Sequence, residues 1–312
     1  MDHWILVTLS VLVAALGATA LVTITQARAA ERKTPPIGRF LEVDGVRLHY
    51  LEQGQGDPVV LIHGSGALIQ DFTVSGLVDG LSGHHRVIVF DRPGYGYSTR
   101  PRGRIWTPRA QAEVPDKALD QLGVEQATVL GHSWGTLVAV ALALRFPSRV
   151  RALVLASGYY FPTARLDIAL LSFPAVPVIG DVTRYTVLPL FGRLLLPRIV
   201  RDLFEPAPVP ERFDRLFPAE MALRPSQLRA SAAETALMLP AVMELQACYR
   251  DLKMPVTIAA GTEDKRVDMG RQSRRLHEEI PQSRFLALPG LGHMVPHLAP
   301  DQVMRAVQTA AQ

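Results

Sequence analysis

The first long pattern along the chain is an uncharged apolar run from Trp4 to Ile24. At about 1.5 Å per residue, a helix of this length covers roughly 31 Å, enough to cross the hydrocarbon core of a bilayer. A cleaved signal peptide is the alternative, because Ala27-Arg-Ala29 resembles a cleavage site. The run is longer than an ordinary signal core, however, and no Lys or Arg precedes it. We therefore predict a transmembrane anchor or uncleaved signal in residues 1–30.

Basic residues follow this run rather than precede it. Arg28, Arg32 and Lys33 lie after the predicted span, whereas only Asp2 and His3 are charged or titratable before it. The positive-inside rule then favours a cytoplasmic location for the rest of the chain. The membrane is thus an expected partner through the N-terminal helix.

Short apolar runs dominate the chain beyond a polar, proline-containing linker at 31–38. An Asp44-Gly45 pair between two alternating runs predicts a β-hairpin. Later runs are continuous in Val, Ile and Leu, which is typical of strands covered on both faces. They lie at 58–63, 86–90, 127–130, 150–155, 255–260 and 283–288.

Helix-like stretches separate these runs, and strand–helix alternation predicts a mostly parallel sheet. They lie at 69–81, 107–122, 134–146, 270–280 and 301–311. Thr107 and Pro108 supply an N-cap and a first-turn proline, whereas Pro115 should kink or split that helix. The stretch at 134–146 is apolar nearly all round and is expected to be buried.

One segment, 161–249, lacks any strand pattern and is interrupted by many prolines. Prolines at this density cut helices into short pieces. We interpret the segment as a helical cap inserted over the edge of the sheet. Residues 39–160 and 250–312 would then form the α/β core.

Composition narrows the possible functions. Apolar residues make up 48% and charged residues 20%, as in an ordinary globular protein, and the net charge is only +4. No basic, aromatic-interleaved helix or zinc-finger spacing is present, so no nucleic-acid partner is expected. The single cysteine, Cys248, excludes an intramolecular disulfide, and a buried, inert thiol in a helix is expected there.

A nucleophile motif, G-x-S-x-G, lies at Gly131-His-Ser133-Trp-Gly135. It follows a predicted strand and opens a predicted helix, the setting of a nucleophile on a sharp turn. Only small residues fit two places before and after such a residue, and both places are glycine. Ser133 is therefore the predicted nucleophile; a serine that merely caps a turn is the alternative.

A serine hydroxyl needs a base, and the base needs an orienting carboxylate. His293 lies in a glycine-rich loop after the last predicted strand and is preferred over His297, the expected start of a helix. Asp264 follows the strand at 255–260 and is preferred as the carboxylate. Its neighbours Glu263 and Asp268 are the alternatives.

An oxyanion in such a site requires preorganised donors. One expected donor is the backbone N–H of Trp134, directly after the nucleophile. The loop His63-Gly64-Ser65-Gly66 follows an early strand, and its small residues allow the N–H of Ser65 to point inward. A plain glycine turn is the alternative for this loop.

Together these segments resemble the α/β-hydrolase superfamily, in its serine-nucleophile branch with a helical cap. The resemblance covers roughly Gly38 to the C-terminus. It implies an eight-stranded, mostly parallel sheet with helices on both faces, and a cap that lines the substrate pocket. It also implies a triad of Ser133, His293 and Asp264. It rests on His63-Gly64, Asp91-Arg-Pro-Gly-Tyr-Gly-Tyr-Ser98, the motif at 131–135, Asp264 and Gly292-His293.

The same resemblance excludes branches that use an aspartate nucleophile, such as haloalkane dehalogenases and epoxide hydrolases, because Ser133 occupies that place. Trp134 also resembles proline iminopeptidases, which need cap carboxylates to hold an amine. Asp167, Glu205 and Glu244 are the cap residues considered for this role. We expect them to be solvated.

The leading hypothesis is a membrane-anchored serine hydrolase that cleaves carboxylic esters through an acyl-enzyme. The apolar cap and the anchor favour a lipid-like small-molecule substrate. No cofactor or metal is implied, and the oligomeric state is not predicted. The alternatives are an amide, peptide or C–C bond hydrolase with the same triad, and a hydrolase fold used only for ligand binding. The basic stretch at 99–109 is expected to be a solvated loop; contact with anionic lipids is the alternative.

Overall fold

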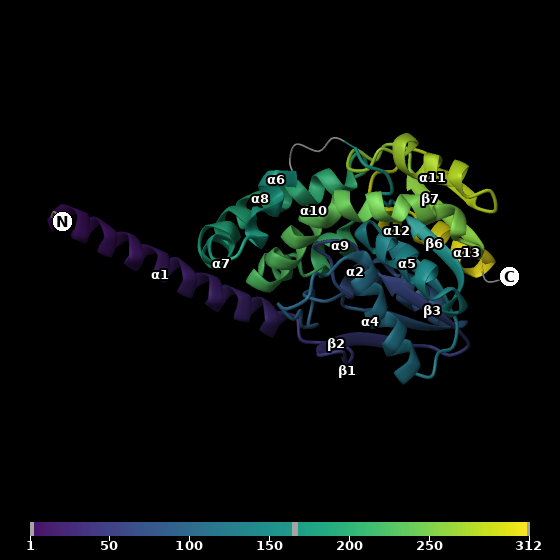
Figure 1. Cartoon of the computed structure of the whole chain (residues 1–312), viewed down its shortest axis with the longest axis horizontal. Coiled ribbons are helices and arrows are strands. Elements are labelled where there is room, and N and C mark those ends of the chain that lie inside the picture. The colour runs from purple at the N-terminus through teal and green to yellow at the C-terminus, as the bar shows by residue number, and fades with distance from the viewer. Residues whose placement is uncertain (1–2, 164–167, 311–312) are drawn as a thin grey trace.

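The computed structural model describes residues 3–163 and 168–310. A single helix, α1 (His3–Lys33), projects from the body of the molecule (Figure 1). Its apolar part is the one segment of the described chain long and apolar enough to cross a membrane, and none of that part is buried. Since α1 continues to Lys33, the first three residues of the predicted linker are helical.

The core is an eight-stranded sheet in the order β1-β2-β4-β3-β5-β6-β7-β8. The strands β1 and β2 form the predicted hairpin around Asp44-Gly45, and β2 also runs antiparallel to β4. All other pairs are parallel. The strands are β1 (Arg39–Val43), β2 (Val46–Gln53), β3 (Asp57–Ile62), β4 (His85–Phe90), β5 (Ala127–His132), β6 (Val150–Ala156), β7 (Val256–Gly261) and β8 (Arg284–Leu288).

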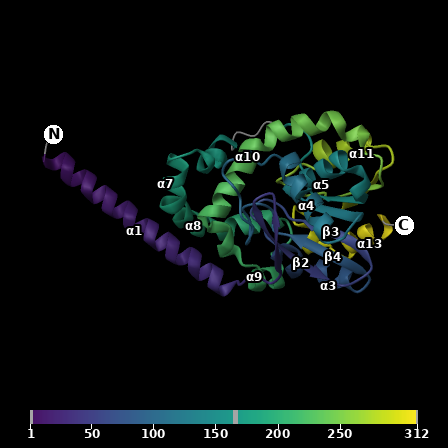
Figure 2. The same cartoon turned by 60° about the horizontal axis from the view of Figure 1, so that its bottom comes forward.

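Helices cover both faces of this sheet because alternate strand residues point to opposite sides. Val60 and Ile62 belong to a core shared with α4 (Pro108–Gln121), α5 (Trp134–Arg145) and α11 (Arg275–Glu279). Val59 and Leu61 belong to a second core, shared with α2 (Gln70–Ser75), α3 (Leu77–Ser82) and α13 (Pro300–Ala310). The predicted fold class is thus confirmed (Figure 2).

The local structure differs in detail from several expectations. The helix expected at 69–81 breaks at Gly76, whose φ of 86° ends α2 and allows α3 to start in a new direction. Pro115 does not split α4, because Val114 and Ala118 on either side of it are held in the core. The stretch from Gly270 begins as a π-helical turn before α11. Cys248 lies in a 3₁₀ turn and is partly exposed, not buried within an α-helix.

The cap segment, 161–249, contains five α-helices among its described residues. They are α6 (Ile168–Ser172), α7 (Ile179–Tyr185), α8 (Val187–Phe204), α9 (Glu211–Leu216) and α10 (Pro225–Leu245). The last turns of α1 pack beside this segment, against α7, α8 and the 3₁₀ turn Ala219–Leu223. Shorter elements are 3₁₀ turns at Pro147–Arg149, Phe173–Ala175 and Gln246–Asp251, and α12 (Val295–Leu298).

Candidate active site

Ser133 lies at the sharp turn between β5 and α5. Its φ of 53° and ψ of −122° are strained for a residue with a side chain. A Cβ on Gly131 would lie 2.6 Å from the carbonyl oxygen of Gly135, and one on Gly135 would lie 2.1 Å from that of Ile62. Both positions therefore require glycine, which is the physical basis of the motif.

The three residues predicted from the sequence as a triad lie in contact. Nε2 of His293 is 3.0 Å from Oγ of Ser133, and its Nδ1 is 2.8 Å from Oδ2 of Asp264. The other oxygen of Asp264 accepts backbone hydrogen bonds from Arg266 and Val267, at 2.8 and 2.9 Å. Asp264 and His293 are buried, so this carboxylate is held in one orientation against the imidazole.

The residues considered as alternatives lie elsewhere. Glu263 is exposed, and Asp268 bonds the backbone N–H of Arg271. His297 lies within α12, with its Nε2 2.8 Å from Oδ1 of Asp71.

The loop after β3 lies directly against Ser133. A Cβ on Gly64 would lie 3.0 Å from that of Ser133, which is closer than side chains ordinarily pack, so glycine favours this approach. Ser65 lines the same cavity as Ser133, and its hydroxyl is 3.1 Å from that of Tyr95. Trp134 is the buried first residue of α5. Of the two expected oxyanion donors, Trp134 thus follows Ser133 directly in the chain, and Ser65 lines the same cavity as Ser133.

His63 supports this loop from beneath. Its Nδ1 is 2.8 Å from the carbonyl oxygen of Gly64, and its Nε2 accepts the N–H of Arg92 at 3.0 Å. One nitrogen therefore donates while the other accepts, which requires a neutral ring. Burial, together with the charge of Arg92, lowers the pKa of His63 from 6.5 to about 4.

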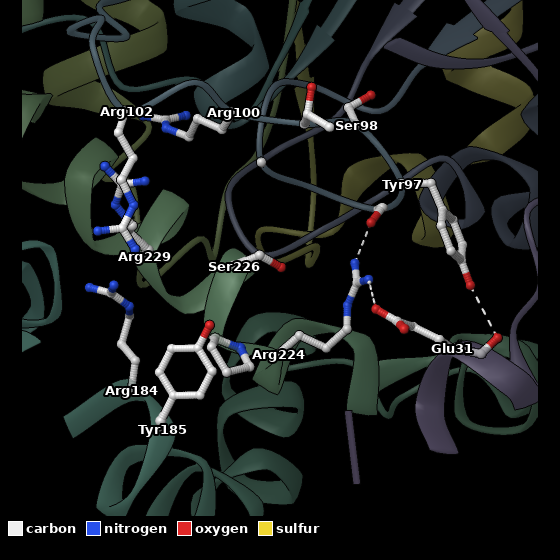
Figure 3. Close-up of a pocket in the computed structure, with 14 residues that line it drawn as sticks. Glu31, Tyr97, Ser98, Arg100, Arg102, Arg184, Tyr185, Arg224, Ser226 and Arg229 are labelled. Atoms are coloured by element: carbon white, nitrogen blue, oxygen red, sulfur yellow. Dashed lines mark hydrogen bonds and ion pairs between the residues drawn. The ribbon is translucent and has the colours of Figure 1, made fainter. Parts of the chain in front are cut away.

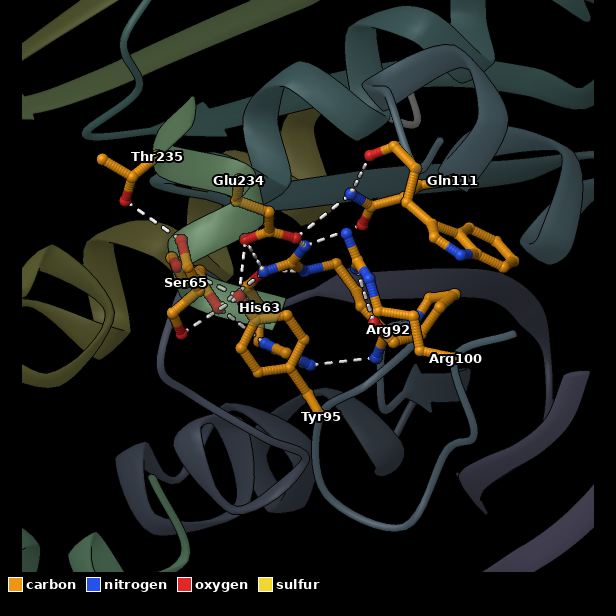
Figure 4. A network of polar contacts seen from close by, with 12 residues as sticks. His63, Ser65, Arg92, Tyr95, Arg100, Gln111, Glu234 and Thr235 are labelled. Atoms are coloured by element: carbon orange, nitrogen blue, oxygen red, sulfur yellow. Dashed lines mark hydrogen bonds and ion pairs between the residues drawn. The ribbon is translucent and has the colours of Figure 1, made fainter. Parts of the chain in front are cut away.

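A buried ion pair joins this loop to the cap, and it could not be recognised from the sequence. Arg92 binds Glu234 of α10 and donates to the carbonyl oxygens of His63 and Gly64, at 2.7 and 2.9 Å (Figure 4). The Tyr95 hydroxyl donates to Glu234 at 2.6 Å. Burial alone would raise the pKa of Glu234, but the charge and hydrogen bonds of Arg92 outweigh burial and lower it.

A second buried carboxylate, Asp71, lies near His293, with His132 between them. Nδ1 of His132 is 3.5 Å from Oδ2 of Asp71, and its Nε2 is 3.2 Å from the carbonyl oxygen of His293. Burial would raise the pKa of Asp71, but the imidazoles of His132 and His297 hold it well below its usual range. Asp71 could not be recognised from the sequence, because its partners lie far along the chain.

The triad opens into a cavity of about 200 Å³. The cap contributes apolar side chains to its wall, chiefly from one face of α8. Among the residues that the structure describes, no Arg or Lys lines this cavity. The apolar lining residues are Leu196, Ile199, Val200, Leu203, Phe213, Phe217 and Met294.

The cap carboxylates considered for an amine do not line this cavity. Glu205 is paired with Lys265 at 2.9 Å, and Glu244 with Arg109 at 2.7 Å, both at the surface. Asp167 lies outside the described residues. Within the described chain, no group of three or more His, Cys, Asp or Glu side chains has the arrangement of a metal site.

Comparison with known proteins agrees with this architecture. Residues 57–300 match the sequence profile of the α/β-hydrolase fold. A 2-hydroxy-6-oxo-2,4-heptadienoate hydrolase of Pseudomonas putida is 30% identical over 83% of this chain and 90% of its own length. A 2-hydroxymuconate semialdehyde hydrolase of Pseudomonas putida is 39% identical, over 45% of this chain and 51% of its own length. The match to that second relative thus spans about half of the relative's own length.

A solved membrane phospholipase A, described as a bacterial virulence factor, has the same fold at 21% identity. Its TM-score is 0.66, and the match covers 99% of this chain and 98% of that one. Structural similarity therefore extends over the N-terminal helix as well as the core. The extent of the profile match and of the 30% identical relative establishes that this chain belongs to the α/β-hydrolase family.

Proposed function

We propose that this protein is a serine hydrolase that cleaves neutral, lipophilic carboxylic esters through an acyl-enzyme. Ser133 attacks the ester carbonyl while His293 takes its proton, and Asp264 orients the imidazole. The same imidazole then protonates the departing alcohol. A water molecule activated by His293 hydrolyses the acyl-enzyme and restores Ser133. The 3.0 and 2.8 Å contacts within the triad support these roles.

The backbone N–H groups of Ser65 and Trp134 are the proposed oxyanion donors. The close approach of Gly64 to Ser133 supports this role. The N-terminal end of α5, which begins at Trp134, adds a favourable field for negative charge. Loss of one such donor in a related setting costs about 10²–10³-fold in kcat.

The observation that carries the ester proposal is the lining of the catalytic cavity. Its cap side is apolar, and no Arg or Lys among the described residues faces it. Burying an alkyl chain against this wall is favourable, whereas a substrate carboxylate would find no cationic partner there. A neutral ester with a hydrocarbon chain fits these conditions.

A carbon–carbon bond hydrolase is the second candidate, and the relatives favour it. Their names include a 2-hydroxy-6-oxo-2,4-heptadienoate hydrolase, at 30% identity. Such a compound contains no ester or amide, so its hydrolysis breaks a carbon–carbon bond. It also carries a carboxylate, however, which the cavity lining described above does not favour.

We further propose that α1 anchors the protein in a membrane. Its length and composition support an anchor, although a signal sequence shares these properties. The cap beside it exposes apolar side chains, with Leu194 78% and Phe191 62% accessible on α8. Other residues of α8 line the catalytic cavity. This arrangement would place the site close to a bilayer that holds lipophilic esters. The basic residues after α1 favour the cytoplasmic side.

A substrate panel tests the choice between the two activities. We would measure kcat/KM for p-nitrophenyl esters of increasing acyl length, for a 2-hydroxy-6-oxo-dienoate and for a prolyl p-nitroanilide. For the esters, we expect kcat/KM to rise about fourfold per added methylene until the cavity is filled, at ~0.8 kcal/mol per group. Ser133→Ala is the control for background hydrolysis. A dienoate turned over faster than every ester would instead favour the carbon–carbon bond hydrolase.

A further inference from the structure

A second pocket lies between the end of α1, the loop after β4 and the cap (Figure 3). It encloses about 390 Å³ and shares no described lining residue with the catalytic cavity. Arginines from three parts of the chain line it. They are Arg100 and Arg102 of the loop, Arg184 of α7, Arg224 just before α10 and Arg229 within α10.

The positive charge of this pocket exceeds the negative charge around it. Five guanidinium groups line the pocket, and two carboxylates among the described residues bond to them; Glu234, whose charge also acts on Arg100, is already paired with Arg92. Glu31 bonds Arg224 at 2.8 Å, and Asp181 is shared by Arg102 and Arg184. Arg100 donates only to a backbone carbonyl, that of Pro93, at 2.9 Å. Among the described residues, the positive charge that lines the pocket therefore exceeds the negative charge around it.

Two of these groups have unused hydrogen-bonding capacity. Arg184 is 2% exposed, yet its buried Nε has no hydrogen-bond partner. Arg229 has no hydrogen bond or ion pair to any residue that the structure describes. Partial burial and the charges of Arg102 and Arg184 lower the pKa of Arg229. The guanidiniums of Arg102, Arg184 and Arg229 repel one another across the cavity. This repulsion favours an anion bound between them.

The start of α10 adds to this field. The 21-residue helix begins at Pro225, and both Pro225 and Ser226 line the pocket. The first N–H groups of a helix lack intrahelical partners and favour anions. Planar guanidiniums that converge from different elements suit a tetrahedral anion with several acceptor oxygens. The volume also leaves room for an organic group attached to such an anion.

We propose that this pocket is a binding site for a phosphate group, with Arg102, Arg184 and Arg229 as its main ligands. The phosphate group can come from a soluble phosphate ester or from the headgroup of an anionic lipid. Glu31, in the last turns of α1, lines the pocket, so a lipid held by the same membrane as α1 is within reach. The proposal does not depend on ester hydrolysis by Ser133.

The test uses the full chain, Arg229→Gln and a matched control, Arg215→Gln. Arg215 is an exposed arginine of α9 that pairs with Glu211 and lines neither pocket. In detergent, calorimetric titration with inorganic phosphate and glycerol 3-phosphate measures binding, with chloride used to hold ionic strength constant. In nanodiscs, the unfolding temperature is compared between phosphatidylcholine alone and phosphatidylcholine mixed with phosphatidic acid.

We expect the wild type and Arg215→Gln to bind equally, and Arg229→Gln to bind at least tenfold more weakly. Arg102→Gln, an exposed second variant, should weaken binding in the same direction. Binding in the titration without stabilisation by phosphatidic acid identifies a soluble phosphate ester. Stabilisation by phosphatidic acid, with or without binding in the titration, identifies a lipid headgroup. Equal behaviour of the wild type and Arg229→Gln in both arms would overturn the proposal. Ester turnover by Arg229→Gln is measured separately. Failure of the phosphate-site proposal can then be told apart from failure of the proposed ester hydrolysis.

Discussion

At the scale of single residues, the catalytic geometry depends on positions where no larger group fits. Ser133 holds a strained backbone, and Gly64, Gly131 and Gly135 lie too close to neighbouring atoms for a Cβ to be added without movement. His63 then has to remain neutral to bridge Gly64 and Arg92. Each of these residues helps to fix the position of the Ser133 hydroxyl or of the loop that faces it.

Asp264→Asn should abolish most turnover while leaving the fold intact. The amide can keep the backbone contacts of Asp264, but it cannot hold His293 in the tautomer that accepts a proton from Ser133. We expect kcat to fall about 10³–10⁴-fold. Glu263→Gln is the matched control, because Glu263 is the adjacent, exposed carboxylate. Similar losses in the two variants would mean that Asp264 is not the orienting carboxylate.

His63 should make stability fall as the pH drops from 6.5 to 4. Its pKa in the folded protein is about 4, so in this window the unfolded chain binds a proton that the folded chain does not. The free energy of unfolding then decreases by about 1.4 kcal/mol per pH unit. Urea unfolding at pH 7 and pH 5 should differ by about 2 kcal/mol from this group.

His63→Gln provides the comparison. The variant should be less stable than the wild type at pH 7, because a fitted hydrogen-bonding ring is lost. Its stability should, however, change less between pH 7 and pH 5. An unchanged pH dependence in the variant would show that another group causes the loss.

At the scale of elements, α10 connects the cap to the loop that faces the nucleophile. Glu234 on α10 binds Arg92, which in turn holds the carbonyl groups of His63 and Gly64. The position of one cap helix is therefore coupled to the loop that carries Ser65. Apolar packing alone would allow the cap to shift; a buried, directional ion pair favours one position.

Glu234→Gln should destabilise the protein by about 3 kcal/mol, because it leaves Arg92 buried without its counter-ion. Turnover should fall as well, since the loop before Ser65 loses its support. Glu244→Gln on the same helix breaks a half-exposed pair with Arg109 and should cost less than about 1 kcal/mol. Chemical unfolding of both variants measures the difference. Equal losses of unfolding free energy in Glu234→Gln and Glu244→Gln would contradict a special role for the buried pair.

The strands and the nucleophile turn could be predicted from the sequence because their signals are local. Continuous Val, Ile and Leu runs mark strands buried on both faces, and the glycines around Ser133 mark the turn. The pairs Arg92–Glu234 and Asp71–His132 could not be predicted, because their members meet only through the fold. The break at Gly76 was missed for a related reason. A glycine inside an apolar pattern does not reveal whether its φ is positive.

At the scale of the whole molecule, α1 lies beside the cap helices α7 and α8 (Figures 1 and 2). These helices and the residues next to them carry exposed apolar side chains. Leu194, Phe191 and Val178 are all more than half exposed. Large apolar side chains gathered in this way indicate an interaction surface. The bilayer in which α1 is proposed to lie is the simplest partner for this surface.

A form lacking residues 1–24 should therefore still bind lipid vesicles, with a lower affinity than the full chain. Leu194→Ser in this form should reduce partitioning at least tenfold, since burial of a leucine is worth about 1.5–3 kcal/mol. Met243→Ser on α10, also exposed, is the matched control and should have little effect. Vesicle flotation measures partitioning. No vesicle binding by the shortened form would contradict contact between the cap and the membrane.

The proposed activity requires that Ser133 is an activated nucleophile, and covalent labelling measures this property. Full-length protein and its Ser133→Ala variant would be treated with a fluorophosphonate and analysed by intact mass. We expect one label per wild-type chain and none on the variant. A well-folded wild type that takes up no label would overturn the proposed role of Ser133 and favour a hydrolase fold used only to bind a ligand.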